Sequence, residues 1–364
     1  INAGTLIANN NTALGSVSAG TTVSDSATLE INNATIGNEA VTVTGTGTDG
    51  NGALIGTGTG SLSGTISLTG NTTIGGTGSL TLSGIISETG GARTVTKTDT
   101  GTVTLSGANT YSGGATVSAG ILAAQNNNAL GTASTTVNSG GTLQINDGIT
   151  VANALTLNGS GAAGTEGALV GTGAATASGA ITLGSDTTIG AINPTDTLTL
   201  SNTINGAAAL TLEGAGSVIL TGNIGNLTRL SSVTANSTAV IDAPLIRTTC
   251  DQTYAGTVLV GRAMTFDSSG GNIAFNGIVD GDGDFDLTVN SSGTTTFAGT
   301  VGATDALSSL AVTASGININ GGSVATVGNQ TYTVAITLGA DTIFSTAAGS
   351  GNVTVAINNG IGGN

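Results

Sequence analysis

The chain contains no histidine, no tryptophan and a single cysteine in 364 residues. Without histidine, catalytic triads of the Ser-His-Asp type, Cys-His nucleophiles and most zinc sites are excluded. The lone cysteine, Cys250, cannot form an internal disulfide, and its neighbours Ile246 and Tyr254 predict that it fills a small apolar space. Intermolecular pairing and thiol reactivity are the alternatives for this residue.

Positive charge is scarce. The chain has 5 Lys and Arg residues against 20 Asp and Glu residues, which gives a net charge of −15 and a pI near 4.1. This balance disfavours nucleic acids and anionic membrane surfaces as partners. No apolar run approaches the length of a transmembrane helix, so no direct membrane insertion is expected of this segment. The composition is typical of an extracellular protein.

Large side chains are also few. Aromatic residues make up 2% of the chain and charged residues 7%, whereas hydrophobic residues reach 38% and glycine occurs 62 times. Such a chain is apolar but lacks the bulky residues of an ordinary compact core. Its Val, Ile and Leu residues alternate with Thr and Ser, as at residues 79–83, 102–106 and 196–201. Alternation over short runs predicts strands with one buried face and nearly excludes helix.

A long internal repeat covers the first two thirds of the chain. Residues 52–58 return as residues 167–173, and residues 72–75 return as residues 187–190. We therefore predict that residues 1–235 form a β-helix built of two repeats of roughly 115 residues.

A shorter repeat follows it. The sequence Gln-Thr-Tyr occurs at residues 252–254 and again at residues 330–332. Residues 236–364 are therefore predicted to continue the β-helix with repeats of roughly 78 residues.

The turns between the short strands favour a stacked architecture. The alternating runs are bounded by Gly, Asn and Asp and are spaced too regularly for long connections. These features predict an all-β, single-chain parallel β-helix, or β-solenoid, whose coils take about 20 residues and stack about 4.8 Å apart. A compact sandwich is the weaker alternative, because it needs wider sheets and rarely shows so long a repeat.

The repeats resemble a known family. Residues 101–107, 109–113 and 115–122 are similar to the passenger-associated repeat of autotransporter proteins from Gram-negative bacteria. The Gln-Thr-Tyr blocks resemble repeats of filamentous-haemagglutinin-type exoproteins. The resemblance implies a right-handed β-helix exposed at the outer membrane or released from it, and says much less about activity.

The ends of the chain add an expectation about its extent. Residue 1 is not preceded by a signal peptide, and residues 358–364 do not read as strands of an outer-membrane barrel. We therefore expect the chain to be a mature fragment.

One acidic segment is a candidate metal site. Alternate carboxylates with intervening glycines can wrap a calcium ion, and residues 280–286 carry four of them. The segment is not an EF-hand loop, because the glutamate at its twelfth position is missing. The alternative is a polar turn between two strands. The predicted calcium ligands are Asp280, Asp282, Asp284 and Asp286.

Residues 222–256 break the repeat pattern and contain two of the few basic residues, Arg229 and Arg247. They are expected to join the two arrays, with a binding protrusion as the alternative. Three tyrosines follow Asn-Thr or Gln-Thr and are expected to pack at corners rather than to form a ligand platform: Tyr111, Tyr254 and Tyr332.

These observations predict a non-enzymatic structural and adhesive β-helical rod of the bacterial cell surface, an adhesin that presents a repetitive polar surface to host or neighbouring cells. The close alternative is a self-assembling subunit of a surface layer or extracellular filament that contacts copies of itself laterally or end to end. A remote alternative is a polysaccharide-active β-helix enzyme, for which the only acidic cluster is residues 280–286 and the nearest basic residue is Arg262. No cofactor is required apart from the predicted calcium.

Overall fold

The computed structural model describes residues 1–236, 239–347 and 351–355. Its regular structure is β apart from a 3₁₀ turn at Thr48–Gly50, and neighbouring strands pair in parallel. The chain divides into two compact units, of which unit 1 is Ile1–Thr182 with Thr187–Leu198, and unit 2 is Leu183–Asp186 with Thr199–Asn364. The predicted all-β parallel β-solenoid is confirmed in each unit. Among the described residues, no helix is long and apolar enough to cross a membrane.

The alternation of the sequence sets which side chains enter the core of unit 1. In β12 (Thr102–Leu105), Val103 and Leu105 are buried while the threonines are half-buried. Each strand pairs with its counterparts one coil before and one coil after, so like residues stack in rows. One such row consists of Leu80, Val103 and Leu122.

The coil length follows from the register of the pairs. Val95 pairs with Ala115, Ala115 with Thr135, and Thr135 with Leu155, so successive partners are evenly spaced along the chain. Their spacing agrees with the coil length expected from the sequence. Longer coils accommodate extra loop residues, as between Leu143 and its partner Leu169.

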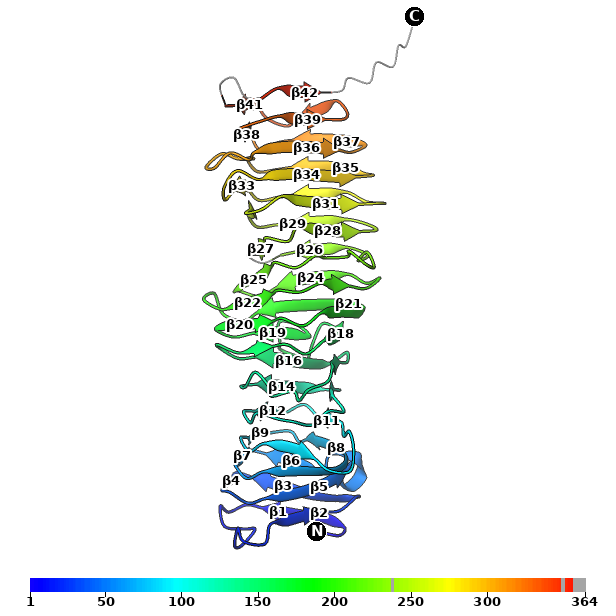
Figure 1. Cartoon of the computed structure of the whole chain (residues 1–364), viewed down its shortest axis with the longest axis vertical. Helices are drawn as coiled ribbons and strands as arrows, with labels where there is room; N and C mark the ends of the chain where they lie inside the picture. Colours follow the sequence, from blue (N-terminus) through cyan, green and yellow to red (C-terminus); the bar gives the residue numbers. More distant parts are fainter. Residues whose placement is uncertain (237–238, 348–350, 356–364) are drawn as a thin grey trace, which may run out of the picture. The chain divides into compact units, whose positions relative to one another are not determined.

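The strands of unit 1 form columns that Figure 1 shows stacked one above another. One column contains β4 (Thr35–Ile36), β7 (Thr59–Leu62), β9 (Ser79–Leu82), β12, β14 (Gly120–Ala124), β16 (Gly141–Ile145) and β19 (Leu169–Gly171). A second contains β1 (Gly4–Ala8), β3 (Ala27–Asn32), β6 (Leu54–Thr57), the second half of β8 (Ile66–Gly75), β11 (Val95–Lys97), β13 (Ala115–Val117), β15 (Thr135–Val137) and β18 (Leu155–Gly159). A third contains β2 (Thr21–Val23), β5 (Val41–Gly45), the first half of β8 and β10 (Ile86–Glu88). The other strands of this unit are β17 (Thr150–Val151) and β20 (Ala174–Ala177).

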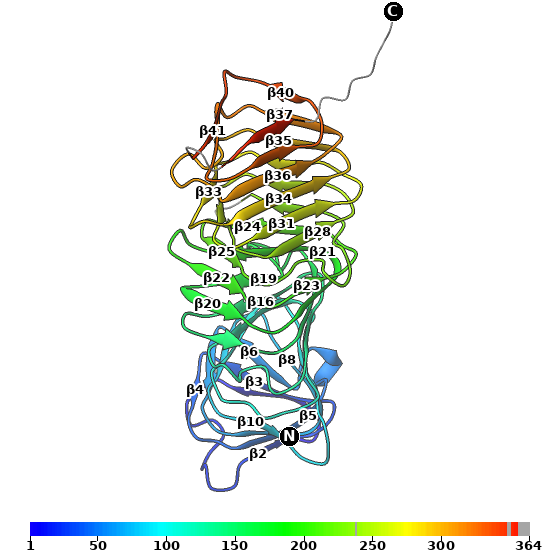
Figure 2. The same ribbon diagram turned by 45° about the horizontal axis from the view of Figure 1, so that its top comes forward.

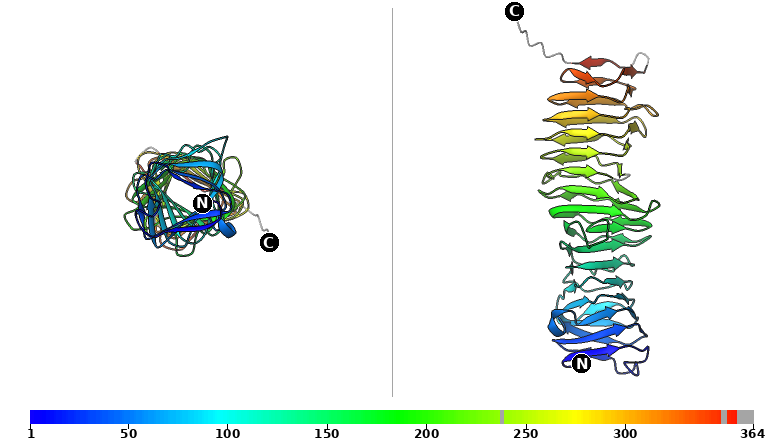
Figure 3. Two further views of the ribbon diagram at one scale, coloured as in Figure 1. Left: turned by 90° about the horizontal axis from the view of Figure 1, so that it is seen from below. Right: turned by 180° about the vertical axis from the view of Figure 1, so that it is seen from behind.

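Unit 2 has three faces, seen from two further directions in Figures 2 and 3. The first face consists of β24 (Leu210–Glu213), β26 (Val233–Ala235), β29 (Gln252–Tyr254), β32 (Ile273–Phe275), β35 (Thr294–Phe297), β37 (Gly316–Ile319) and β40 (Ile336–Leu338). The second consists of β28 (Leu245–Thr248), β31 (Met264–Ser268), β34 (Asp286–Ser291), β36 (Ser309–Thr313), β39 (Gln330–Tyr332) and β42 (Val353–Val355). The third consists of β25 (Ser217–Leu220), β27 (Ala239–Ile241), β30 (Val258–Val260), β33 (Val279–Gly281), β38 (Ser323–Thr326) and β41 (Ile343–Thr346).

Three strands remain. They are β21 (Ile181–Ala191) and β22 (Thr197–Leu200), which contain residues of both units, and β23 (Ile204–Asn205) in unit 2. The division of the chain into two units thus falls within residues 182–199. The predicted boundary between residues 235 and 236 concerns the sequence repeats and stays a prediction.

Asparagine and aspartate side chains join successive coils at the turns. The Oδ1 atom of Asn71 accepts the backbone N–H of Thr94 at 3.1 Å, and that of Asn127 accepts the N–H of Thr150 at 2.9 Å. These amides lie at strand entrances, where the parallel ladder leaves them without a backbone partner. The Asn- and Asp-rich turns are therefore structural parts of the solenoid.

Candidate functional site

The first residue of the predicted calcium segment is used by the fold. Asp280 lies in β33 and is 8% exposed, and its Oδ1 atom accepts the backbone N–H groups of residues 304 and 305 at 3.2 and 3.0 Å. Asn205 has the same role in an earlier coil, where its Oδ1 atom accepts the N–H groups of residues 227 and 228 at 2.9 and 3.2 Å. Because an uncharged asparagine serves there, the contact of Asp280 does not depend on a metal ion.

The other three carboxylates belong to an exposed turn. We call residues 281–286 the acidic turn. Asp282, Asp284 and Asp286 are exposed, and Asp286 accepts a hydrogen bond from the Ser309 hydroxyl at 2.7 Å. In the described part of the chain, no group of three or more His, Cys, Asp or Glu side chains is placed to hold a metal ion. Calcium at these residues stays a prediction.

A buried hydrogen-bond network explains the first Gln-Thr-Tyr block. The Nε2 atom of Gln252 lies 3.1 Å from the Thr248 hydroxyl, 3.1 Å from the Asp267 carbonyl and 3.5 Å from the Ile246 carbonyl. The Tyr254 hydroxyl donates to the Oε1 atom of Gln252 at 2.9 Å. Both side chains are buried, so the amide has its polar atoms satisfied inside the solenoid.

The second block repeats this network atom for atom. The Nε2 atom of Gln330 lies 3.2 Å from the Thr326 hydroxyl, 2.9 Å from the Ser345 carbonyl and 3.3 Å from the Val324 carbonyl, and the Tyr332 hydroxyl donates to its Oε1 atom at 3.1 Å. The expected packing of these two tyrosines is confirmed, although they lie in strands β29 and β39 rather than at corners. However, β29 belongs to the first face and β39 to the second, so the repeat returns on a neighbouring face of unit 2.

Two arginines share one carboxylate beside the first network. The Nη2 atom of Arg229 lies 2.6 Å from the Oδ2 atom of Asp267, and the Nε atom of Arg247 lies 3.2 Å from the same oxygen. The Nη1 atom of Arg229 also donates to the carbonyls of Thr248 and Asp267 at 3.1 and 3.2 Å. The side chains of Arg229, Arg247 and Asp267 are 23, 34 and 24% exposed. Arg229 is thus held in place, whereas Arg247 uses one donor.

An apolar side chain projects from the loop next to this pair. Leu227 is 83% exposed, and its backbone N–H is held by Asn205. Gly225, with φ at +68°, lets the loop pass so close to Arg229 that a Cβ atom there would lie 3.2 Å from its Cα atom. The loop backbone that carries the exposed leucine is therefore held close to Arg229 and Arg247. We call Leu227, Arg229, Arg247 and Asp267 the arginine corner.

The second copy of the network has no such charges. Leu230 pairs with Thr248 in one copy and Leu307 with Thr326 in the other, which aligns the two loops. Three structural equivalents follow from this alignment and from the shared contacts of the two glutamines: Ala306 for Arg229, Ala325 for Arg247 and Ser345 for Asp267. Because the same buried network forms with small neutral residues, the charges of the arginine corner are not required by the fold.

The other basic residue of this region is paired. The Nε and Nη2 atoms of Arg262 each lie 2.7 Å from an oxygen of Asp242, a two-bond geometry. The hydrogen bonds that Arg262 donates to Asp242 raise its pKa above the usual value. Arg262 therefore carries no unbalanced charge.

The prediction for Cys250 is wrong, because its side chain is exposed. It lies at a corner after β28, where its backbone N–H donates to Ser231 and its carbonyl accepts the hydroxyls of Thr248 and Ser268 at 2.6 and 2.7 Å. These contacts turn the backbone inward and the thiol outward. The apolar neighbours in sequence fill the core in its place.

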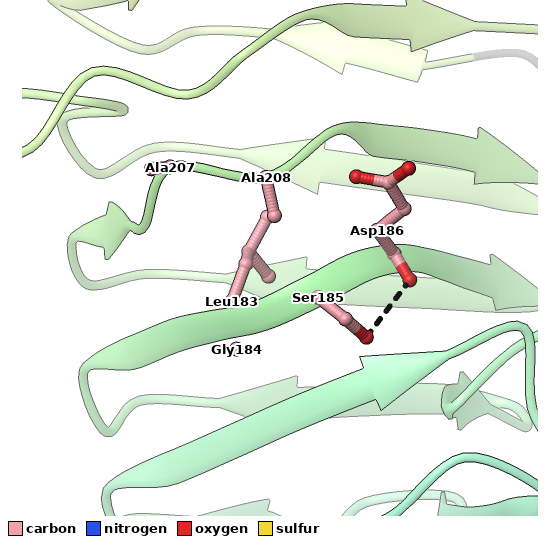
Figure 4. Close-up of a pocket in the computed structure, with 6 residues that line it drawn as sticks. All are labelled: Leu183, Gly184, Ser185, Asp186, Ala207 and Ala208. Atoms are coloured by element: carbon pink, nitrogen blue, oxygen red, sulfur yellow. Dashed lines mark hydrogen bonds between the residues drawn. The ribbon is translucent and has the colours of Figure 1, made fainter.

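A hollow on the surface of unit 2 is shallow and carries little chemistry. It has a volume of about 410 Å³ and is lined by Leu183, Gly184, Ser185, Asp186, Ala207 and Ala208 (Figure 4). Asp186 is its one ionisable lining residue, and the Oδ1 atom accepts the backbone N–H of Ala209 at 2.9 Å. The hollow therefore does not provide the paired acid and base groups of a glycosidase.

Sequence reasoning missed a buried lysine in unit 1. Lys97 lies in β11 with no exposed surface, and its Nζ atom donates to the carbonyls of Thr98, Asp99 and Ala119 at 2.6, 2.8 and 3.1 Å. Burial lowers the pKa of Lys97 to about 8, although the Asp99 carboxylate opposes the shift. Gly120 leaves room for the ammonium group, since a Cβ atom at that position would lie 2.8 Å from the Nζ atom, but this proximity is not apparent from the sequence.

Comparison with known proteins agrees with this architecture. The family described as Passenger-associated-transport-repeat matches residues 95–124, from the start of β11 to the end of β14. No curated protein and no solved structure was found to match the chain. The repeat and the parallel solenoid together fit an autotransporter passenger-like β-helical repeat protein.

Proposed function

We propose that the chain is a non-enzymatic structural and adhesive protein, displayed on the Gram-negative cell surface or released from it. The observation that carries the proposal is the passenger-associated repeat at residues 95–124, embedded in parallel coils. Repeats of this kind build a scaffold rather than an active site. The net charge of −15 directs the search away from nucleic acids and anionic membranes.

The proposed mechanism is additive. Each coil buries a thin row of aliphatic side chains and hydrogen-bonds to its neighbours, so stability grows with the number of coils. The outward positions repeat the same small polar residues, as do Thr102 and Thr104 in β12 and Thr116 in β13. A surface that repeats weak contacts can hold a cell by avidity even when each contact is weak.

A bead adhesion assay tests this proposal. Beads coated with the purified chain should attach to host or bacterial cells, and beads coated with a globular protein of similar net charge should not. Attachment should fall when the chain is unfolded in urea before coupling, because the polar rows exist only in the folded coils. Equal attachment of both bead types, or release of new chain ends from an acidic polysaccharide, would overturn the proposal.

A second candidate function, self-assembly, is favoured by the arginine corner. The fold does not require the charges of the arginine corner, yet two of the chain's few basic residues lie there. The corner also combines these charges with an exposed leucine. Such a combination is typical of protein contact surfaces.

A further inference from the structure

We propose that the arginine corner is a docking surface for the acidic turn of a second copy of this chain. The inference does not depend on adhesion to cells. It rests on three properties of unit 2: the divergence of its two internal copies, the chemistry of the two surfaces, and their places in the fold.

The internal repeat provides a built-in comparison. Both copies contain the same buried glutamine and tyrosine and the same loop held by an Asn or Asp side chain. They differ on the outside, where Arg229 and Arg247 stand in one copy and Ala306 and Ala325 in the other. In the second copy the corresponding loop lies against the acidic turn instead, through the Gly283 N–H and the Asp305 carboxylate at 3.1 Å. The two copies have thus become surfaces of opposite charge.

The chemistry of the two surfaces is complementary. At the arginine corner, the side chain of Arg247 makes no hydrogen bond besides that to Asp267 among the described residues, which leaves the outer edge of its guanidinium for a carboxylate. Leu227 offers an apolar contact beside it. The acidic turn presents exposed Asp282 and Asp284 next to Phe285, which is 37% exposed. Charge and apolar surface are therefore paired on both sides.

The nearby acidic residues leave this charge available. Asp267 is shared by two arginines, so one positive charge remains unbalanced. Asp251, in the adjoining corner, is turned toward Asn272, whose backbone N–H and Nδ2 atoms lie 2.7 and 3.3 Å from its Oδ1 atom. Asp242 is occupied by Arg262. The arginine corner is thus a local positive site on an acidic chain.

The two surfaces lie at different places in the fold, so the contact between them can repeat from one copy to the next. Arg247 lies in β28 of the second face and Arg229 in the loop that leads to the first face. The acidic turn lies between β33 of the third face and β34 of the second. A contact between two different surfaces is heterologous, so it propagates from copy to copy unless its rotation closes a ring.

Charge reversal tests the proposal on the whole chain. Sedimentation velocity at about 0.15 M salt, where surface charges more than about 8 Å apart are screened, should show concentration-dependent association of the unaltered chain. R247D and D284R should each weaken association about tenfold or more, since each places like charges together. The double variant R247D/D284R restores the pair in reverse and should regain most of the association.

Two further variants keep the test decisive. A325D adds a negative charge at the position equivalent to Arg247, on the copy that lies against the acidic turn, and should not weaken association. L227S replaces a side chain that is 83% exposed, so it should weaken association without loss of strand signal in circular dichroism. Absence of association in the unaltered chain, equal loss in A325D, or no recovery in the double variant would overturn the proposal. Because no cell is present in this assay, its failure is distinguishable from a failure of the adhesion proposal.

Discussion

Lys97 places a charged group where the alternation of its strand calls for an apolar side chain. The ammonium group donates to three backbone carbonyls, and it can donate three hydrogen bonds, so its polar capacity is satisfied without a carboxylate contact. Burial of the ammonium group costs desolvation energy. Its hydrogen bonds stabilise corner carbonyls that the pairing of the β-strands leaves without a partner. The lysine is therefore a structural part of the passenger-associated repeat.

The pKa of Lys97 gives a pH-dependent prediction. Its value in the folded chain is about 8 against a usual 10.5, so between these pH values the unfolded chain binds the proton and the folded chain does not. The contribution of Lys97 to the free energy of unfolding should therefore rise as pH rises from about 8 to about 10. Urea unfolding of the unaltered chain and of K97M, followed by circular dichroism, measures this contribution as their difference. A difference that stays flat or falls over this range would contradict the assignment.

Variants of Asp280 and Asp284 distinguish a structural role of the acidic segment from a role in calcium binding. D280A should lower the free energy of unfolding by about 1–2 kcal/mol, because two backbone N–H groups lose their acceptor, and D280N should cost less since its oxygen remains. D284A, at an exposed position, should change stability by less than about 0.5 kcal/mol. The predicted calcium site further requires that calcium raise the urea midpoint of the unaltered chain and not that of D284A. The same measurement with chelator is the control.

The sequence did not predict whether side chains at the corners of the coils point into the core or toward solvent. Cys250 has apolar neighbours in sequence, yet its backbone hydrogen bonds turn the thiol outward. A lysine is expected at the surface, yet Lys97 is buried and its ammonium group donates to three backbone carbonyls. In both cases the outcome depends on residues one coil away, such as Ser268 and Ala119, whose proximity appears only once the coil lengths are known.

At the scale of elements, the sequence predicted the periodicity of the strands but not the faces on which the repeats lie. The alternation of residues 102–105 predicted the buried and exposed sides of β12 correctly. The Gln-Thr-Tyr repeat identified Gln252 and Gln330 as equivalent but gave no sign that they lie on different faces. A period that is not a whole number of coils rotates its copy to another face. Coil lengths in unit 2 also vary, since Ile317 and its partner Ile336 are closer in sequence than Leu287 and its partner Leu310.

The paired networks predict equal energetic roles for the two glutamines. Q252L keeps the volume of the side chain but leaves the buried Tyr254 hydroxyl without its acceptor and removes the donor to the Thr248 hydroxyl, so it should lower the free energy of unfolding by about 2–3 kcal/mol. Q330L should cost a similar amount. T253A, on the outward side of the same strand, is the matched control and should cost less than about 1 kcal/mol. If Q252L is no more costly than T253A in urea unfolding, the network does not stabilise this face.

At the scale of the whole chain, composition and repetition determined the class of fold. A chain with few aromatic residues and 62 glycines cannot fill a wide core, whereas thin coils need only one aliphatic row per strand. Three of the eight aromatic residues form one row in unit 2, where Tyr254 stacks on Phe275 at 5.4 Å and Phe275 on Phe297 at 5.1 Å. Sequence alternation marked these positions as inward but did not predict the row, since it depends on the register between coils.

A solenoid should tolerate the loss of a whole coil and not of half a coil. Thr294 pairs with Gly316 and Leu287 with Leu310, so removal of residues 294–315 joins positions that already share one place in the repeat. The shortened chain should stay folded, with an unchanged strand signal in circular dichroism and a somewhat lower urea midpoint, because one set of coil-to-coil contacts is lost. Removal of residues 294–304 instead places outward residues of the next coil against the core, since the face of each side chain depends on register. That variant should lose cooperative unfolding, and equal behaviour of the two deletions would show that stability does not reside in the register of the coils.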